Sequence, residues 1–211
     1  MLVLCVGNLC EDILGWLVPC RAWCIPERNL SFFDSIFLMS SISTQKGSFS
    51  SSFSSSTPQW KYDVFLSFRG EDTGNDFTDR LYDALKHKGI FTFRYEQKQK
   101  LETHKYVSLE ILKAVEESRF AIVILSRNYA FSTWCLEELA KIIGCMKKRG
   151  MIVLPIFYGV NRFNVRKQSG SFAQAFAMHE ENFKNHKEKV QTWRATLKEV
   201  SNLEGWHLRD G

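Results

Sequence analysis

Four short apolar runs within residues 60–211 constrain the fold of this chain more than any other feature of the sequence. They are rich in Val, Ile and Phe, and the last two are apolar almost throughout. Runs of this kind are typical of strands buried on both faces of a parallel sheet. The expected strands span residues 62–68, 90–93, 120–126 and 151–157.

Amphipathic stretches separate these runs and continue after the last one. Their spacing predicts helices over residues 76–88, 106–118, 132–148, 171–183 and 187–203. Gly89 and Gly150 stand where helix C-caps are expected. Because strand and helix alternate, the sequence predicts a doubly wound α/β domain, in which a fifth strand is not visible from the pattern.

The first 59 residues differ from the rest and are expected to be a disordered extension, which leaves residues 60–211 as the single domain. Residues 40–57 form a Ser-rich tract with almost no charge, and such a tract buries too little apolar surface to offset chain entropy. Met39 directly precedes this tract. We interpret Met39 as the biological start and residues 1–38 as an extension of the gene model.

Charge and cysteine usage exclude several classes of protein. Glu11 and Asp12 interrupt the apolar N-terminal stretch and no Lys or Arg precedes it, so neither a membrane span nor a secretory signal is expected. The net charge of +5 is too mild to imply a nucleic-acid partner. Residues 60–211 contain only Cys135 and Cys145, a usage that indicates a reduced, intracellular domain.

Ligands of parallel α/β sheets bind outside the carboxyl ends of the strands, where three segments of this chain emerge. These segments are residues 69–72, 94–104 and 126–138. The first reads RGED and lacks the glycine pattern of a phosphate-binding loop. Arg69 could bind a phosphate or carboxylate, or could form a surface ion pair with Glu71 or Asp72.

The third segment leads into the helix expected over residues 132–148, with Ser132 as its N-cap. Glu137 precedes Lys141 by four positions, which predicts a solvated ion pair between them. Glu138 instead borders the apolar face, near both the helix start and the ligand-binding edge. A partly desolvated carboxylate in this place is a candidate catalytic group, and the alternative is an ordinary boundary glutamate.

Two further groups of side chains carry weaker hypotheses. Cys135 could be a nucleophile near a helix N-terminus, but packing in the core is the favoured interpretation. His179 and His186 are seven residues apart and lack a third ligand, so no metal site is expected.

Seven segments resemble, in order, a plant Toll/interleukin-1 receptor (TIR) domain from about residue 62 to residue 208. They read YDVFLSFRGEDT, FTDRLYDAL, GIFTFR, EILKAVEES, IVILSRNYAFSTWCLEEL, LPIFYGV and VRKQSGSFAQAF. The resemblance implies a flavodoxin-like fold and a role in plant immune signalling. It also implies NAD glycohydrolase activity in self-associated domains, with NAD as the substrate and no cofactor.

The resemblance also implies functional residues. The family's catalytic glutamate lies in a W-C-L-x-E-L segment, and the matching residue of this chain is Glu138. By the same match, Phe68, Arg69 and Gly70 line the nucleotide site and Trp134 lies close to the catalytic carboxylate.

The chain departs from the family pattern on both expected self-association surfaces. In the loop after the second strand, Tyr95 replaces an Asp and His104 stands where Gly is expected, and a side chain there penalises a positive-φ backbone. On the first helix, Arg80 replaces a common His, and two apposed arginines would repel each other. These changes put catalytic assembly through residues 94–104 and Arg80 in question.

Two functions are carried forward. The first is an NAD-cleaving enzyme of plant immunity that acts on self-association in the cytoplasm, with the nucleus as a further compartment. The alternative is a non-catalytic adaptor or decoy that binds other TIR domains. No nucleotide-binding ATPase module or leucine-rich repeat follows the domain in the sequence up to Gly211, so we expect a TIR-only protein or a truncated receptor gene. A phospho-acceptor receiver is excluded because no strand ends in an acidic cluster.

Overall fold

A five-stranded parallel sheet forms the centre of the protein, for which a computed structural model describes residues 60–73, 76–95 and 109–209. The strand order is β2-β1-β3-β4-β5, which places the third strand in the middle. All four strand pairs are parallel. The strands are β1 (Tyr62–Ser67), β2 (Thr92–Phe93), β3 (Ser118–Leu125), β4 (Ile152–Tyr158) and β5 (Trp206–Leu208).

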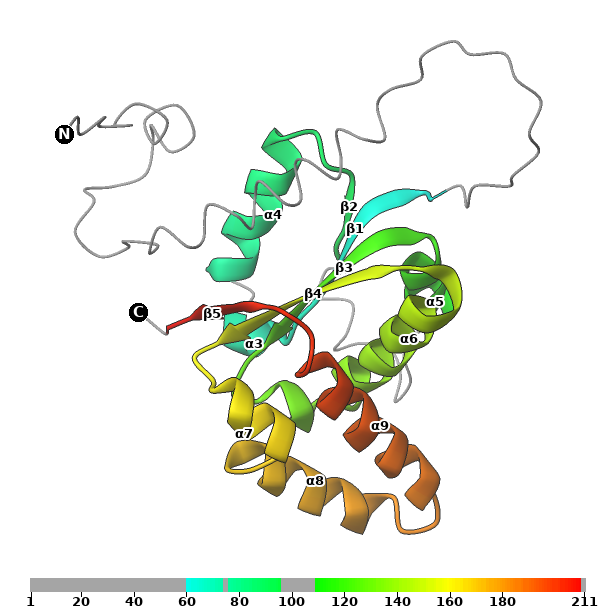
Figure 1. The fold of residues 1–211 in the computed structure, drawn as a ribbon, viewed down its shortest axis with the longest axis vertical. Coiled ribbons are helices and arrows are strands. Elements are labelled where there is room, and N and C mark those ends of the chain that lie inside the picture. Colours follow the sequence, from blue (N-terminus) through cyan, green and yellow to red (C-terminus); the bar gives the residue numbers. More distant parts are fainter. Residues whose placement is uncertain (1–59, 74–75, 96–108, 210–211) are drawn as a thin grey trace, which may run out of the picture.

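Helices cover both faces of this sheet and extend beyond one of its edges. Figure 1 shows α4 on one face and α5, α6 and α9 on the other, with α7 and α8 below. The helices are α3 (Gly70–Thr73), α4 (Phe77–His87), α5 (Leu109–Glu116), α6 (Thr133–Arg149), α7 (Arg162–Lys167), α8 (Ser171–Asn182) and α9 (Lys187–Val200), with a 3₁₀ helix η3 (Tyr129–Phe131) before α6. This is the doubly wound α/β architecture that the sequence predicts.

The structure confirms the four strands and the five longer helices expected from the sequence, with bounds that differ by a few residues. It adds β5, which is only three residues long and pairs with β4 through Ile156 and Trp206. A strand this short shows no period of its own, so its position depends on the neighbouring strand. The caps of α6 are confirmed, since Ser132 accepts a hydrogen bond from the Cys135 amide and Gly150 is left-handed. Helix α4 instead has Lys88 as its C-cap, and the left-handed Gly89 follows directly.

The middle strand β3 carries apolar side chains on both faces, because successive side chains of a strand point in opposite directions. One set packs with α5, α6 and α9, and consists of Ala121, Val123 and Leu125. The other set packs with α4, and consists of Phe120, Ile122 and Ile124. Residues 120–125 are at most 2% exposed. A strand buried in this way explains why the sequence run is apolar without alternation.

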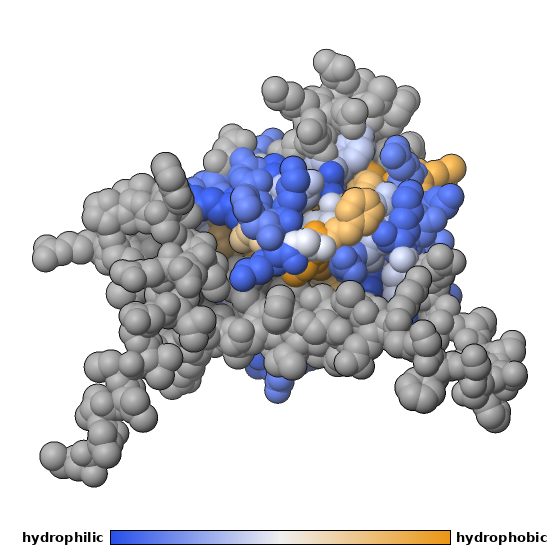
Figure 2. All heavy atoms as spheres, turned by 90° about the horizontal axis from the view of Figure 1, so that it is seen from above, coloured by the Kyte–Doolittle hydropathy of each residue, from blue (hydrophilic) through white to orange (hydrophobic). Residues whose placement is uncertain are grey.

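One face of the described residues is largely polar (Figure 2). Seen from above, hydrophilic residues dominate one face and apolar residues reach it in a narrow strip between them (Figure 2). No described helix is long and apolar enough to cross a bilayer. Within residues 60–73, 76–95 and 109–209, no cluster of three His, Cys, Asp or Glu side chains could hold a metal ion.

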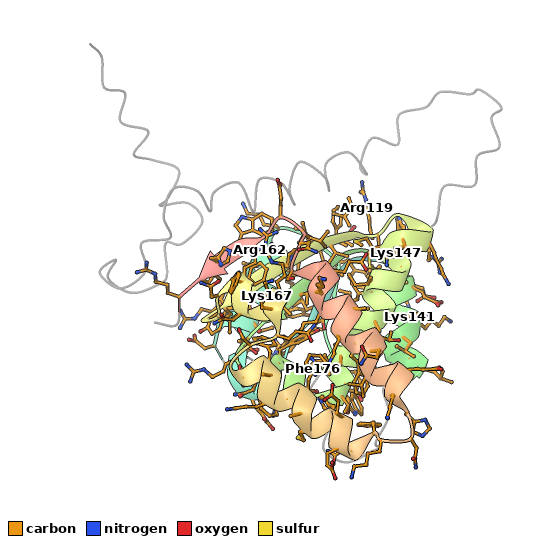
Figure 3. All side chains as sticks on the ribbon, turned by 60° about the horizontal axis from the view of Figure 1, so that its bottom comes forward. Arg119, Lys141, Lys147, Arg162, Lys167 and Phe176 are labelled. Atoms are coloured by element: carbon orange, nitrogen blue, oxygen red, sulfur yellow. The ribbon has the colours of Figure 1, made fainter. Side chains whose placement is uncertain are left out.

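The predicted ion pair between Glu137 and Lys141 is wrong. Glu137 pairs with Lys189 of α9, and Lys141 pairs with Glu116 of α5. Helices α5 and α9 lie on either side of α6 and bring opposite charges to both residues, which the sequence of α6 cannot reveal. Figure 3 shows Lys141 on the side of α6 that lies away from the sheet.

Several sequence predictions lie outside the described residues. They are the extension over 1–59, the start at Met39 and the part of the second loop from residue 96 to His104. These stay predictions.

His179 is a buried histidine of α8 that is enclosed by aromatic rings. Its Nε2 atom lies 2.8 Å from the Ala130 carbonyl oxygen, which can only accept, so the proton is on Nε2. Nδ1 is buried and has no hydrogen-bond partner. Phe176, labelled in Figure 3, and Trp193 have ring centroids 6.1 and 5.2 Å from the imidazole. Burial lowers the pKa of His179, and the Ala130 hydrogen bond only partly offsets this effect.

The lowered pKa of His179 predicts acid sensitivity. Between this pKa and about 6.5, the value of an unfolded histidine, the unfolded chain binds more protons, so the free energy of unfolding falls as the pH falls below about 6.5. We expect His179→Gln, which can still donate to Ala130, to lose less stability than the wild type between pH 7.5 and pH 5.5. Urea unfolding measures this slope. The matched control is His87→Gln at an exposed position, which should keep the wild-type slope. An unchanged slope in His179→Gln would contradict the prediction.

Gly205 makes a close approach to β4 and should not tolerate a side chain. A Cβ atom at this position would lie 2.8 Å from Pro155 Cγ and would also overlap the Pro155 carbonyl oxygen. We expect Gly205→Ala to lower the free energy of unfolding by about 1–3 kcal/mol through overpacking. Gly144→Ala within α6, where a Cβ would meet nothing within 4 Å, should raise it by about 1 kcal/mol. Equal effects of the two substitutions in chemical denaturation would show that the contact with Pro155 is not decisive.

Candidate functional site

The carboxyl ends of β1 and β3 meet the start of α6 around the buried carboxylate of Glu138. Glu138 is 2% exposed, and its Oε2 atom accepts a hydrogen bond of 2.8 Å from the Ser67 hydroxyl group. Ser67 is the last residue of β1 and is fully buried. The structure therefore agrees with the expectation that Glu138 is less solvated than Glu137, which is partly exposed.

Tyr129 of η3 completes this buried cluster. Its hydroxyl oxygen lies 3.0 Å from Ser67 Oγ, and the same hydroxyl donates to the Cys135 carbonyl oxygen at 3.0 Å. Burial raises the pKa of Tyr129 well above its ordinary value, with smaller contributions from Cys135 and Glu138. Tyr129 thus keeps its proton and remains a hydrogen-bond donor beside the carboxylate.

Phe68 follows Ser67 in the chain and packs in the cluster that faces α4, and Trp134 lies one helical turn before Glu138. The Phe68 carbonyl oxygen accepts a hydrogen bond of 3.5 Å from Cys135 Sγ, which ties β1 to α6. Trp134 is partly buried, and its ring centroid lies 6.4 Å from that of Tyr95, just after β2. Residues from three segments that are distant in the chain are therefore brought to one edge of the sheet.

Arg69 is engaged in local contacts, which agrees with the surface ion pair considered above. Its guanidinium group pairs with Glu71, lies 3.9 Å from Asp72 and donates to the Asn128 carbonyl oxygen at 3.2 Å. Gly70 directly follows Arg69 and is the first residue of α3. Arg69 and Gly70 thus lie in the first loop, and Arg69 binds the loop after β3 rather than Glu138.

Asp72 holds the first loop and the loop after β3 together. Its carboxylate accepts hydrogen bonds from Ser126 Oγ at 2.5 Å, from the Asn128 amide at 2.9 Å and from Asn128 Nδ2 at 3.1 Å. Hydrogen bonds to a charged acceptor are stronger than those between neutral groups. Asp72 therefore fixes the backbone on which Arg69 and Tyr129 stand.

Arg94 follows β2 and lies close to Phe68. Its guanidinium carbon is 5.8 Å from the Phe68 ring and 5.3 Å from the Tyr82 ring, and it pairs with Asp79. Its Nε atom is buried without a hydrogen-bond partner. Arg94 thus adds a positive charge beside the predicted substrate residue Phe68.

Sequence reasoning placed Asp72, Arg94 and Tyr129 in segments at the ligand-binding edge without assigning them a role in the site, and it did not find Ser67. Ser67 stands within an apolar run and looks like an ordinary residue of a strand. Tyr129 has no acidic or basic neighbour that would indicate a functional role. The one signal for Asp72 is a carboxylate in the first loop, which is equally consistent with an exposed residue.

Two other sequence hypotheses are decided by local contacts. Cys135 is 1% exposed within the core, which confirms the packing interpretation. Arg80 lies 2.5 Å from Asp76, four residues before it on the chain, so its charge has an acidic partner on its own surface.

A hollow of about 400 Å³ lies elsewhere on the same edge, between the loop after β3 and the start of α8. It is lined by residues such as Arg127, Asn161 and Gly170, and by none of the residues predicted for the site. The hydrogen bonds around Glu138 mark the candidate site better than this hollow does, because they converge on a buried charge. The segment that follows Tyr95 lies outside the described residues.

The family model for the TIR domain matches residues 61–211. The chain belongs to the TIR domain family. This agrees with the five-stranded parallel sheet and with the segments quoted from the sequence.

The TIR domain is similar to those of plant disease resistance proteins. It is 53% identical over 167 residues to disease resistance protein RPV1 of Vitis rotundifolia, covering 77% of this chain and 12% of RPV1. It is 51% identical over 152 residues to TMV resistance protein N of Nicotiana glutinosa, covering 72% of this chain and 13% of that protein. This chain therefore spans only a small part of the relatives it matches.

A solved structure supports the same assignment. The TIR domains of the activated Roq1 resistosome, which directly recognizes the pathogen effector XopQ, align with a TM-score of 0.66 and 49% identity. The alignment covers 71% of this chain and 89% of that chain. The likeness therefore extends over nearly the whole of the solved domain.

The role of Asp72 in holding the first loop to the loop after β3 can be tested by measuring the free energy of unfolding. We expect Asp72→Ala to lower the free energy of unfolding by about 2–4 kcal/mol, because three donors lose a charged acceptor. The neighbouring Glu71 is 75% exposed, so Glu71→Ala should change stability by less than about 0.5 kcal/mol. Denaturant unfolding followed by Trp fluorescence gives both values. Losses of equal size would show that Asp72 does not hold the two loops.

Proposed function

We propose that this TIR domain is an NAD glycohydrolase of plant immune signalling, with Glu138 as its catalytic residue. The observation that carries the proposal is the buried Glu138 carboxylate, held by Ser67 at the carboxyl edge of the sheet. Family membership and the position of Glu138 in the Trp134–Leu139 segment support it.

The chemistry needs one fixed negative charge. When the bond between ribose C1′ and the nicotinamide nitrogen breaks, its electron pair goes to the nitrogen and positive charge builds on the ribose, as in glycoside cleavage. A preorganised carboxylate stabilises this charge. Water then adds to C1′ and releases one proton, which gives ADP-ribose and neutral nicotinamide. Because nicotinamide leaves as a neutral base, the reaction does not require a general acid.

The remaining residues of the site have supporting roles in this proposal. Trp134, partly buried one helical turn before Glu138, supplies aromatic surface on which the nicotinamide or adenine ring can lie. Phe68 is 3% exposed and would line the nucleotide site from the end of β1. Arg69 and Gly70 would meet the phosphates or the ribose, which requires Arg69 to exchange its contact with Glu71 for a substrate oxygen. Arg94 is a second cation close to Phe68. NAD is the substrate, and no other cofactor or metal is invoked.

We further propose that activity depends on self-association, in the cytoplasm. The Roq1 relative is described as TIR domains within an activated resistosome, which supports an assembled active form. Asp76 beside Arg80 lowers the repulsion that two apposed arginines would create. Turnover per molecule should then rise with protein concentration.

A direct test measures nicotinamide release from NAD by the concentrated full-length chain. We expect Glu138→Gln to lose at least about 100-fold in rate, because it keeps the shape and hydrogen-bond acceptor of the side chain but removes its charge. The matched control is Glu137→Gln, the neighbouring carboxylate that pairs with Lys189, and its rate should not change. Full activity in Glu138→Gln would show that the catalytic residue lies elsewhere.

The adaptor remains the alternative function, and one observation favours it. Arg69 is already paired with Glu71 and with the loop after β3, so it is not free for a substrate phosphate. If the wild type and Glu138→Gln are equally inert in the NAD assay but both self-associate in light scattering, the adaptor is the better conclusion.

A further inference from the structure

Three buried side chains from different parts of the chain form a connected set of hydrogen bonds at the candidate site. Ser67 ends β1, Tyr129 lies in η3 after β3, and Glu138 lies in the second turn of α6. Ser67 and Tyr129 are completely buried, and Glu138 is 2% exposed. Water therefore contributes little to the solvation of this carboxylate, and its charge depends on the protein groups around it.

The number of hydroxyl hydrogens gives this set a direction. A carboxylate only accepts, so Ser67 uses its single hydrogen on Glu138 Oε2, 2.8 Å away. The Ser67 oxygen is then an acceptor for Tyr129, whose hydroxyl lies 3.0 Å from it. Tyr129 also donates to the Cys135 carbonyl oxygen at 3.0 Å, so its single hydrogen is shared between Ser67 Oγ and that carbonyl.

We propose that Ser67 and Tyr129 are positioning residues for Glu138, and that their hydroxyl groups form a relay, from Tyr129 to Ser67 to Glu138, that holds the carboxylate charged and in one orientation. The inference rests on the proposed function for its catalytic meaning, but the relay itself is a property of the folded chain. Each donor polarises the next, so the second hydroxyl strengthens the bond made by the first.

The relay predicts a specific order of effects. Ser67→Ala removes the donor that touches Glu138, so the charged carboxylate loses its support directly. Tyr129→Phe keeps the ring in the core and removes a hydroxyl group that supports Glu138 through Ser67, so its effect is in the same direction but smaller. In the Ser67→Ala background the link through Ser67 is gone, so Tyr129→Phe should add less to the shift than it causes alone.

The experiment is a ¹³C NMR titration of the Glu138 carboxyl carbon in the full-length chain, with the signal assigned by its loss in Glu138→Gln. Ser67→Ala should move the midpoint of this titration to higher pH by about one to two units, the equivalent of one hydrogen bond to a charged group. The matched control is Ser118→Ala, a buried serine whose hydroxyl donates to the Ala114 carbonyl, and it should leave the midpoint unchanged.

The pH dependence of NAD cleavage gives a second readout. The acid limb of kcat/KM should move to higher pH in Ser67→Ala by the same amount as the NMR midpoint, which a loss of rate through general destabilisation would not produce. If the wild type does not cleave NAD, the proposed function fails while the NMR titration still decides the relay. If Ser67→Ala does not fold, Tyr129→Phe alone must show the shift.

An unmoved midpoint in Ser67→Ala would overturn the inference. An effect of Tyr129→Phe that adds fully to that of Ser67→Ala would overturn it too, because the tyrosine would then act on Glu138 by another route.

Discussion

Burial of β3 on both faces, between two parallel neighbours, is the constraint on which the rest of the structure depends. Its register with β1 and β4 places the carboxyl ends of these strands at the same edge. The loops that follow β1 and β3 must therefore lie side by side, whatever residues they contain. The apolar side chains of β3 determine the packing of the helices, and its backbone pairing determines where a site can form.

Two carboxylates at this edge are used in different ways. Asp72 accepts three hydrogen bonds from the loop after β3, so its charge is fully used in joining that loop to the first one. Glu138 is more buried and depends on the Ser67 hydroxyl, itself in contact with Tyr129. Asp72 is thus engaged in holding the two loops, and Glu138 is the carboxylate to which we assign the proposed chemistry.

The predictability of the elements follows their length. Strands and helices with several buried positions were found from periodicity, because each position reports the same face. β5 has three residues and depends on its contact with β4, and α7 has six, so neither carries a period long enough to recognise. The ion-pair partners of Glu137 and Lys141 were wrong for a related reason, since their true partners come from α9 and α5.

The candidate site was only partly predictable. Glu138 could be found because it borders the apolar face of a helix at the expected ligand edge, and the family resemblance points to the same residue. Ser67 and Tyr129 could not, because a hydroxyl group has no signal in the sequence until its partner is known. Arg69 looked equally suited to a substrate and to Glu71, and its observed contacts are with Glu71 and the loop after β3.

The sequence by itself determined the α/β class, the edge at which a site can lie, the family and the most interesting carboxylate, because each of these depends on local patterns or on short contiguous segments. Only the tertiary structure decided which side chains solvate that carboxylate, which loop Asp72 holds and which charges pair across the helices. These contacts join residues about 50 to 70 positions apart, and the free energy of such a contact is defined only when the chain has brought both partners together.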